Sequence, residues 1–356
     1  MKKLYVIFTL LVAFMSCKTL ISCKNEEKSK LLDNSSSTAK GKENVNSDKT
    51  TPLLGNSGDI GETKPEAIKT GIYQDEDSLY HLKYILEPGK TYSFNSKGVN
   101  KQIVTFRDKS QSITQESYDP ISFTVLNVKD GKYTLQVKMG GKKVVIRADG
   151  KQSVFDTNGK KPEDPDQAKM WKIYKIISEA TFTLNMDIYG NVSEITGMDA
   201  LYNKAKSSLS GELSGEELNG FMNVLKQNIN PEAFKTQFEG SLMKFPAKGL
   251  KIGEKWNNDP SKKGKGYNQL VKVDENTTEI RVQGIIPSKS ESKVVEGVTY
   301  KISLKGSQSG KIILDNKSGW ISKANFNLTV TETKSAKKGE ESELVVQKTE
   351  NNTYIN

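Results

Sequence analysis

Short segments in which apolar and polar residues alternate make up most of the chain after residue 70. Residues 121–128 and 133–139 both alternate with a period of two, and an Asp-Gly pair at 130–131 separates them. Alternation of this kind predicts strands with one buried face, and an Asp-Gly pair between two such strands predicts a hairpin. Asp-Gly at 149–150 and Asn-Gly at 158–159 follow further short apolar segments. The pattern therefore predicts antiparallel sheet.

One central stretch has apolar residues at helical spacing instead. Between Ala168 and Ile177 the bulky residues recur every three or four positions. Ser214 and Glu217 have the spacing of a capping box ahead of a second apolar series, and Asn230-Pro231 supplies an N-cap and a first-turn proline for another helix. Because these helices carry apolar stripes, they must cover a sheet face or one another.

Together these elements predict a mainly β (α+β) fold. We expect curved antiparallel sheets that form a half-barrel or a sandwich, covered by a few central helices. The β-rich body is expected to span residues 71–356, with a helical insertion at about 163–245. Residues 24–70 contain no aromatic residue and are rich in Lys, Glu, Ser and Asn, which predicts a disordered tether.

Residues 1–23 have the organisation of a lipoprotein signal peptide. Lys2 and Lys3 precede the mostly apolar residues 4–16, a stretch too short to cross a bilayer, which takes about 20 residues. Both cysteines of the chain lie near its end. Cys17 directly follows the apolar stretch, which favours it by position.

Cys23 has the better sequence context. It follows Leu20-Ile21-Ser22, which resembles the bacterial lipobox, and the Lys-Asn-Glu-Glu after it resembles the tail of surface-exported lipoproteins of the Bacteroidota. We therefore expect lipidation at Cys23, with Cys17 as the alternative. Each buried CH₂ of an acyl chain such as palmitate contributes roughly 0.8 kcal/mol, so two or three chains anchor a protein stably. The expected location is the cell envelope, at the periplasmic or surface-exposed face of the outer membrane.

Charge and composition narrow the function classes. The net charge is +10, but only three of the 53 cationic residues are Arg, and acidic residues are interspersed with them after residue 23. A nucleic-acid module would concentrate Arg and Lys, so no nucleic-acid partner is expected. His81 is the only histidine, which excludes most His-based zinc sites and nucleophiles activated by histidine. We expect no metal, no cofactor and no catalytic residue, and a packing role for His81 in a strand.

Two acids occupy comparable positions in a faint internal repeat. An apolar strand ends at Asp187 and another at Asp315, and each is followed by a turn that contains Gly and then by another strand. A role in turn formation is the expected one for both. Paired carboxylates of a hydrolase leave no local signature, so a carboxylate-based hydrolase stays an alternative function.

Four segments resemble an uncharacterised lipoprotein family of the Bacteroidota, defined by a domain of unknown function. They are residues 80–92, 186–199, 245–256 and 310–320. The layout is also similar to that of half-barrel lipid carriers of the bacterial envelope, in which helices cover a curved sheet over an apolar cavity. The first resemblance implies no catalytic residues, and the second implies a fold but does not fix a function.

The expected function is that of a non-catalytic envelope lipoprotein. Its body would bind a hydrophobic or lipid-like ligand, or an envelope partner, at the helix-covered face of the sheet. The main alternative is a surface glycan-binding or adhesion module that uses Trp256 and Trp320 as ligand contacts. Asp77-Ser78-Leu79 matches the short O-glycosylation sequon of the Bacteroidota, which makes Ser78 a candidate modification site. The sequence does not specify an oligomeric state.

Overall fold

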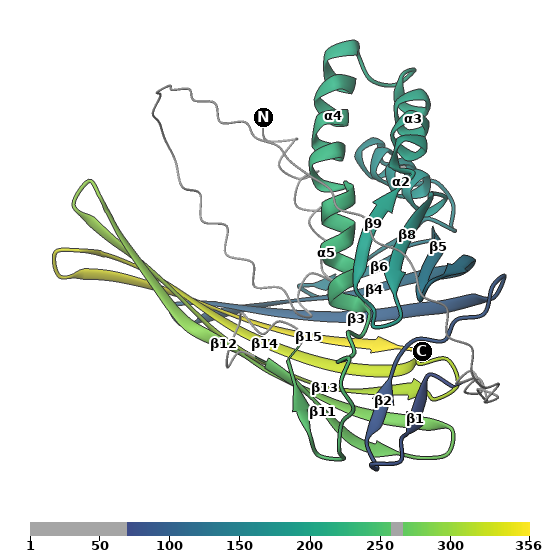
Figure 1. The fold of residues 1–356 in the computed structure, drawn as a ribbon. Helices are drawn as coiled ribbons and strands as arrows, with labels where there is room; N and C mark the ends of the chain where they lie inside the picture. The colour runs from purple at the N-terminus through teal and green to yellow at the C-terminus, as the bar shows by residue number, and fades with distance from the viewer. Residues whose placement is uncertain (1–69, 258–265) are drawn as a thin grey trace, which may run out of the picture. The chain divides into compact units, whose positions relative to one another are not determined.

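The computed structural model describes residues 70–257 and 266–356 (Figure 1). The predicted signal peptide, Cys17, Cys23 and the predicted tether lie outside these residues. None of the helices in the described part of the chain is long and apolar enough to cross a membrane.

The fold is dominated by one antiparallel sheet of 13 strands, with a separate two-stranded hairpin of β1 and β2. The strands are β1 (Ile72–Gln74), β2 (Tyr80–Leu82), β3 (Thr91–Phe106), β4 (Lys109–Lys129), β5 (Lys132–Met139), β6 (Lys143–Ala148), β7 (Lys151–Asp156), β8 (Thr181–Asp187), β9 (Val192–Thr196), β10 (Lys255–Trp256), β11 (Gly266–Val273), β12 (Thr277–Val295), β13 (Val298–Asp315), β14 (Ile321–Lys338) and β15 (Glu341–Ile355).

The sheet is open and follows the order β10-β11-β12-β13-β14-β15-β3-β4-β5-β8-β9, while β6 pairs with β4 and carries β7. Strand β15 joins the two halves of this path because it pairs with β3, with Ile355 opposite Ser96. The predicted turns at 130–131 and 149–150 connect β4 to β5 and β6 to β7. The prediction of a mainly β fold with a large antiparallel sheet and a few helices is confirmed.

Four helices lie on one side of the sheet: α2 (Pro165–Ser178), α3 (Met198–Leu209), α4 (Gly215–Asn228) and α5 (Pro231–Ser241). The predicted caps begin α4 and α5. Ser214 and Glu217 form the capping box, and the Asn230 side chain accepts a hydrogen bond from the Ala233 amide. Helix α3 was not predicted, because its N-cap is a glycine in the left-handed region without a side-chain hydrogen bond.

Aromatic side chains join the helices to the sheet. Phe123 of β4 packs edge-on against Phe238 of α5 and against Trp320, with ring centroids 5.6 and 5.3 Å apart. Phe182 of β8 packs on both Phe234 and Phe238 of the same helix. Helix α5 is therefore fixed on the part of the sheet that contains β4 and β8.

The longest strands continue well beyond this helical cover. We call their outer parts the extension, and the rest of the sheet under the helices the covered half. The hairpins β12–β13 and β14–β15 project away from the helices in Figure 1. None of the extension residues is buried. The extension consists of residues 99–106, 109–116, 285–295, 298–307, 329–338 and 341–350.

Candidate functional site

Strand register carries one face of the sheet from the covered half into the extension. Phe94, whose side chain is buried in the core, lies opposite Ile121, and two residues further along β3 Ser96 lies opposite Asp119 and Ile355. Side chains alternate between faces, so every second residue of β3 stays on this face. We call it the inner face.

Apolar side chains return on the inner face of the extension. Phe106, Ile113, Tyr300 and Ile302 are 38, 43, 45 and 44% exposed. The register places further partly buried apolar residues on the same face. They are Val104, Ile286, Leu304, Val330 and Val345.

The opposite, outer face of the extension is mixed, and Ile285, Val294 and Leu344 are 64, 65 and 53% exposed on it. Its central strand β14 presents alternating Thr329, Thr331, Thr333 and Ser335 there, opposite Ser and Lys residues of β13. Both faces of the extension thus carry apolar and polar side chains, and the inner face is the one that continues the core face of the covered half.

A cavity of about 40 Å³ lies on the inner face beneath α5, where the covered half meets the extension. Helix α5 and its C-cap contribute Gln237, Phe238, Ser241 and Leu242 to its lining. The sheet contributes apolar residues at one end and polar residues at the other. These are Phe94, Ile121, Phe123 and Met139, and Ser96, Gly98, Asn100, Gln115, Ser117, Asp119, Asn351 and Thr353.

An ion pair stands beside this cavity. Asp119 lies 2.5 Å from the ammonium group of Lys142, whose side chain is only 5% exposed. Breaking such a pair is costly because the remaining charge would be poorly hydrated. Burial raises the pKa of the nearby Tyr174 phenol, and the negative charge of Asp119 raises it further.

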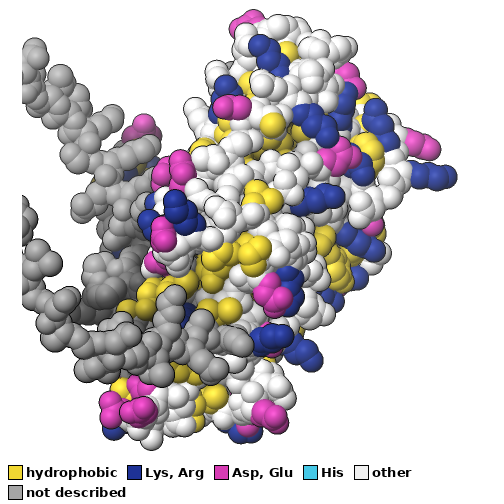
Figure 2. Space-filling view, turned by 45° about the vertical axis from the view of Figure 1, so that its right-hand side comes forward, with side chains coloured by type: hydrophobic (Ala, Val, Ile, Leu, Met, Phe, Trp, Pro, Cys, Tyr) yellow, Lys and Arg dark blue, Asp and Glu magenta, His cyan; other side chains and the backbone are white. Residues whose placement is uncertain are grey.

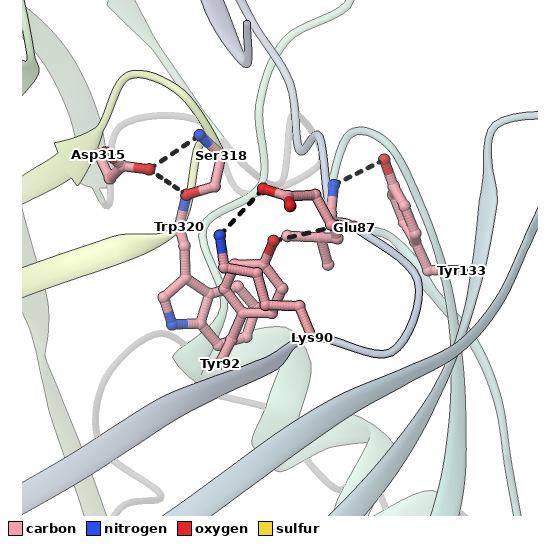
Figure 3. A network of polar contacts seen from close by, with 8 residues as sticks. Glu87, Lys90, Tyr92, Tyr133, Asp315, Ser318 and Trp320 are labelled. Atoms are coloured by element: carbon pink, nitrogen blue, oxygen red, sulfur yellow. Dashed lines mark hydrogen bonds and ion pairs between the residues drawn. The ribbon is translucent and has the colours of Figure 1, made fainter. Parts of the chain in front are cut away.

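A second cluster of polar contacts surrounds the loop between β2 and β3 (Figure 3). Tyr133 accepts a hydrogen bond from the Leu86 amide, and Tyr92 accepts one from the Glu87 amide at 3.1 Å. Lys90 donates to Glu87 at 2.9 Å and lowers the pKa of that carboxyl. These contacts hold the loop in place.

The two turns of the internal repeat grip the segment that leads into this loop. The Tyr84 amide donates to Ile188 at 2.7 Å, and the Ile85 amide donates to Ser318 at 2.9 Å. Gly190 and Gly319 adopt positive φ angles in these turns, where a Cβ would overlap the carbonyl oxygens of Met243 and Lys83. Burial raises the pKa of the enclosed Tyr84 phenol.

Asp187 and Asp315 form these two turns. Asp187 accepts hydrogen bonds from the amides of Tyr189 and Asn191, each at 2.9 Å. Asp315 accepts from the amide and hydroxyl of Ser318 at 2.9 and 2.5 Å. Both acids thus have the turn-forming role expected from the sequence.

The two tryptophans considered as ligand contacts belong to the interior instead. Trp256 and Trp320 are 8 and 6% exposed. Their indole NH groups donate to the backbone oxygens of Lys244 and Ser93 at 3.2 and 3.0 Å. Because they pack in the core, neither ring offers a face to a glycan at the surface. Both tryptophans after the Gly turns therefore serve to pack the core.

The remaining predicted residues in the described part of the chain lie in the separate hairpin of β1 and β2. Ser78 is exposed in the turn between β1 and β2, with a φ of 62°. His81 contacts Asp75 at 2.7 Å and stacks on Tyr73, and its hydrogen bond lowers the pKa of Asp75. No group of three or more potential metal ligands occurs among residues 70–257 and 266–356.

Charges of both signs are interspersed on the face seen in Figure 2, without a large field of Lys and Arg. Such mixing is typical of a solvated surface. Polar cavity residues such as Ser117 and Asn351 were not singled out in the sequence. Their signal is a break in alternation, since Ser117 and Asp119 share a face with Ile121 and Phe123.

Several solved structures resemble parts of the fold only faintly. OmpTdeltaL8 of Vibrio cholerae is 8% identical, with 74% of this chain and 99% of that chain covered and a TM-score of 0.18. Salmonella typhi OmpF in complex with daunomycin is 8% identical, with 77% of this chain and 100% of that chain covered and a TM-score of 0.20. A DUF1329 family protein from Desulfovibrio piger is 9% identical, with 72 and 83% covered and a TM-score of 0.12. TM-scores this low carry no conclusion about fold or function.

No curated protein matches the sequence significantly. A family profile does match: that of a family of unknown function, DUF6263, aligns with residues 130–321. The alignment covers β5 to the start of β14, which is more than half of the chain and includes all four helices. The chain therefore belongs to the DUF6263 family.

Proposed function

We propose that this chain is a non-catalytic, membrane-anchored lipoprotein of the bacterial envelope that binds a hydrophobic or lipid-like ligand. The observation that carries the proposal is the set of apolar side chains on the inner face of the extension, which lie around the ion pair of Glu332 and Lys334. This face continues the core face of the sheet past the last helix and leaves Phe106, Ile113, Tyr300 and Ile302 exposed. Apolar patches of this kind mark interaction sites in soluble proteins.

The apolar residues form two neighbouring groups. Phe106 and Val345 are directly opposed between β3 and β15, with Val104 beside them on the same face. Ile286 of β12 and Val330 of β14 approach each other across Gly306 of β13, where an added Cβ would lie 3.1 and 3.3 Å from them. An extended apolar ligand could contact both groups, and each Å² of apolar surface it covers would contribute roughly 25 cal/mol.

The small cavity under α5 argues for a ligand that lies on the sheet. Its volume of about 40 Å³ is enough for about three waters, and far below the several hundred Å³ of an enclosed site for a drug-sized molecule. A lipid chain therefore has its contacts on the open inner face of the extension.

The membrane anchor rests on the sequence of the first 23 residues. Cys23 after Leu20-Ile21-Ser22 is the proposed acylation site. Membrane fractionation tests it: Cys23→Ser should release the protein into the soluble fraction, whereas Cys17→Ser should leave it bound. If Cys17→Ser alone released the protein, the acylated residue would be Cys17. Retention of the double variant in the membrane would contradict the lipoprotein assignment.

Ligand binding is tested on the full chain carrying Cys17→Ser and Cys23→Ser, so that no acyl anchor interferes. Native mass spectrometry with oleate or monooleoylglycerol should detect a complex. Phe106→Asp together with Ile113→Asp should abolish it, because both charges would enter the apolar surface. Thr105→Asp with Ser112→Asp, on the outer face, is the matched control. Absence of binding in the parent chain, or equal loss in the control, would contradict the proposal.

A further inference from the structure

A band of polar side chains separates the core from the apolar part of the extension on the inner face. Three successive rows form this band. Ser96 lies opposite Asp119, Gly98 lies between Ser117 and Thr353, and Asn100 lies between Gln115 and Asn351. Phe94 and Ile121 precede the band, and Val104 and Phe106 follow it.

Several side chains of this band are largely buried, and their accessible polar atoms bond to no other described residue. Ser117, Asn351 and Thr353 are each 8% exposed, and their side chains bond to no other described residue. No fully enclosed side-chain polar atom among the described residues lacks a partner. The unpaired atoms of these three residues must therefore reach open space, and the space that they line is the cavity under α5.

Buried polar groups normally have partners, because desolvation without a hydrogen bond is unfavourable. Neighbouring amide and hydroxyl groups that face one cavity without bonding to each other can be satisfied by water or by a polar ligand group that replaces it. Because Asn offers both donors and acceptors and Ser and Thr offer either, the complementary group is one that can also do both.

The charges around the cavity exclude an ionic ligand group. Asp119 is the one charged side chain in the described lining, and Lys142 neutralises it at 2.5 Å. A phosphate or carboxylate would find no free cation there and would face Asp119. A cation would have to displace Lys142 from its buried position. An uncharged group meets neither obstacle.

We propose that the cavity under α5 binds the small, uncharged, hydroxyl- or amide-bearing head of an amphiphile whose apolar chain lies on the extension. The inference rests on the ligand site proposed above and names the class of its ligand. From Asn100 to Phe106 the inner face of β3 extends about 20 Å, which gives the chain a continuous path away from the head. The cavity volume of about 40 Å³ limits the enclosed part to a few atoms.

The test compares head groups on the full chain carrying Cys17→Ser and Cys23→Ser. Monooleoylglycerol, oleate and dioleoyl phosphatidylglycerol are titrated by calorimetry. We expect monooleoylglycerol to bind about tenfold more tightly than oleate, the size of effect that one or two satisfied hydrogen bonds give. Ser117→Val with Asn351→Leu should remove this preference and leave oleate binding unchanged. Ser307→Val with Asn325→Leu, on exposed outer-face positions, is the matched control.

Each outcome decides between the two proposals. Equal affinities for the three amphiphiles, or a preference that survives Ser117→Val with Asn351→Leu, would overturn the head-group site and leave ligand binding on the extension intact. Loss of all binding in the parent chain would overturn both. Thermal unfolding checks that each variant folds. If the strand variant does not fold, Gln237→Leu on the cavity side of α5 takes its place, with the same expected loss of preference.

Discussion

The covered half and the extension are built from the same strands but obey different rules. In the covered half, β3 and β4 place Phe94, Ile121 and Phe123 under the helices, and all three are buried. In the extension the same two strands end at Phe106 and Lys109 with no buried residue. The buried core is therefore confined to the covered half, and the extension contributes no buried residue to it.

The largest difference between the halves is expected from truncation of aromatic residues. Phe123→Ala should lower the free energy of unfolding by about 3 to 5 kcal/mol, because Phe123 is 1% exposed and touches both Phe238 and Trp320. Phe106→Ala should cost less than about 1 kcal/mol. Denaturant unfolding of both variants measures this, and similar losses would refute the division into two halves.

Left-handed glycines sharpen the same comparison. Gly319→Ala should cost at least about 2 kcal/mol, because its Cβ would overlap the backbone of Lys83. Gly297→Ala, at the tip of the β12–β13 hairpin, has open space around its Cβ and a φ of 74°. It should cost only the backbone strain of about 1 kcal/mol. Equal shifts of the unfolding temperature for the two variants would show that the contacts between the turns of the internal repeat and residues 82–86 do not stabilise the fold.

Loss of a helix cap should have a smaller effect. Ser214→Ala removes the hydroxyl that accepts from the Glu217 amide at the start of α4, which should cost about 1 kcal/mol. Helix α4 belongs to the covered half, so urea unfolding should report this loss. Ligand affinity on the extension should stay unchanged; a parallel loss of affinity would show that the halves are coupled.

The smallest expected effect is a pH dependence where the halves meet. Arg147, with smaller contributions from Tyr118 and Lys97, lowers the pKa of Glu116 below 4.5. The ionised carboxylate thus stabilises the fold above about pH 4.5, and this contribution disappears as the pH falls through the lowered pKa. Glu116→Gln should flatten the stability profile between pH 5 and pH 3. An unchanged slope would show that other carboxylates govern it.

The outer edge of the extension shows how an uncovered sheet avoids pairing with other chains. Strand β11 pairs with β12 only as far as Gly284, so residues 285–295 have no partner on that side among the described residues. Pro287 lacks an amide hydrogen, the pairing with β13 is irregular between Ile286 and Lys289, and Lys293 adds charge further along. Proline, bulges and lysines are the usual protection of exposed edges.

Local features of the fold could be predicted from the sequence, and long-range ones could not. The Asp-Gly hairpins and the caps at Ser214 and Asn230 depend on neighbouring residues only. Helix α3 has Gly197 as its N-cap, and glycine has no side chain to cap a helix, so the sequence contains no capping motif that predicts this helix. The cavity needed the register of β15 on β3, because Asn351 and Asn100 are 251 positions apart and no pattern in either strand announces their pairing.

The pairing of β15 with β3 also sets the order of events when the chain is made. The strands on either side of this pair can form hairpins as they are synthesised, because their partners follow directly in sequence. Strand β3 acquires its neighbour β15 only when residues 345–355 have been added. Contacts of such long sequence separation slow folding. Strand β15 thus unites the part of the sheet from β10 to β14 with the part from β3 to β9, so the sheet cannot be completed before residues 345–355 have been made.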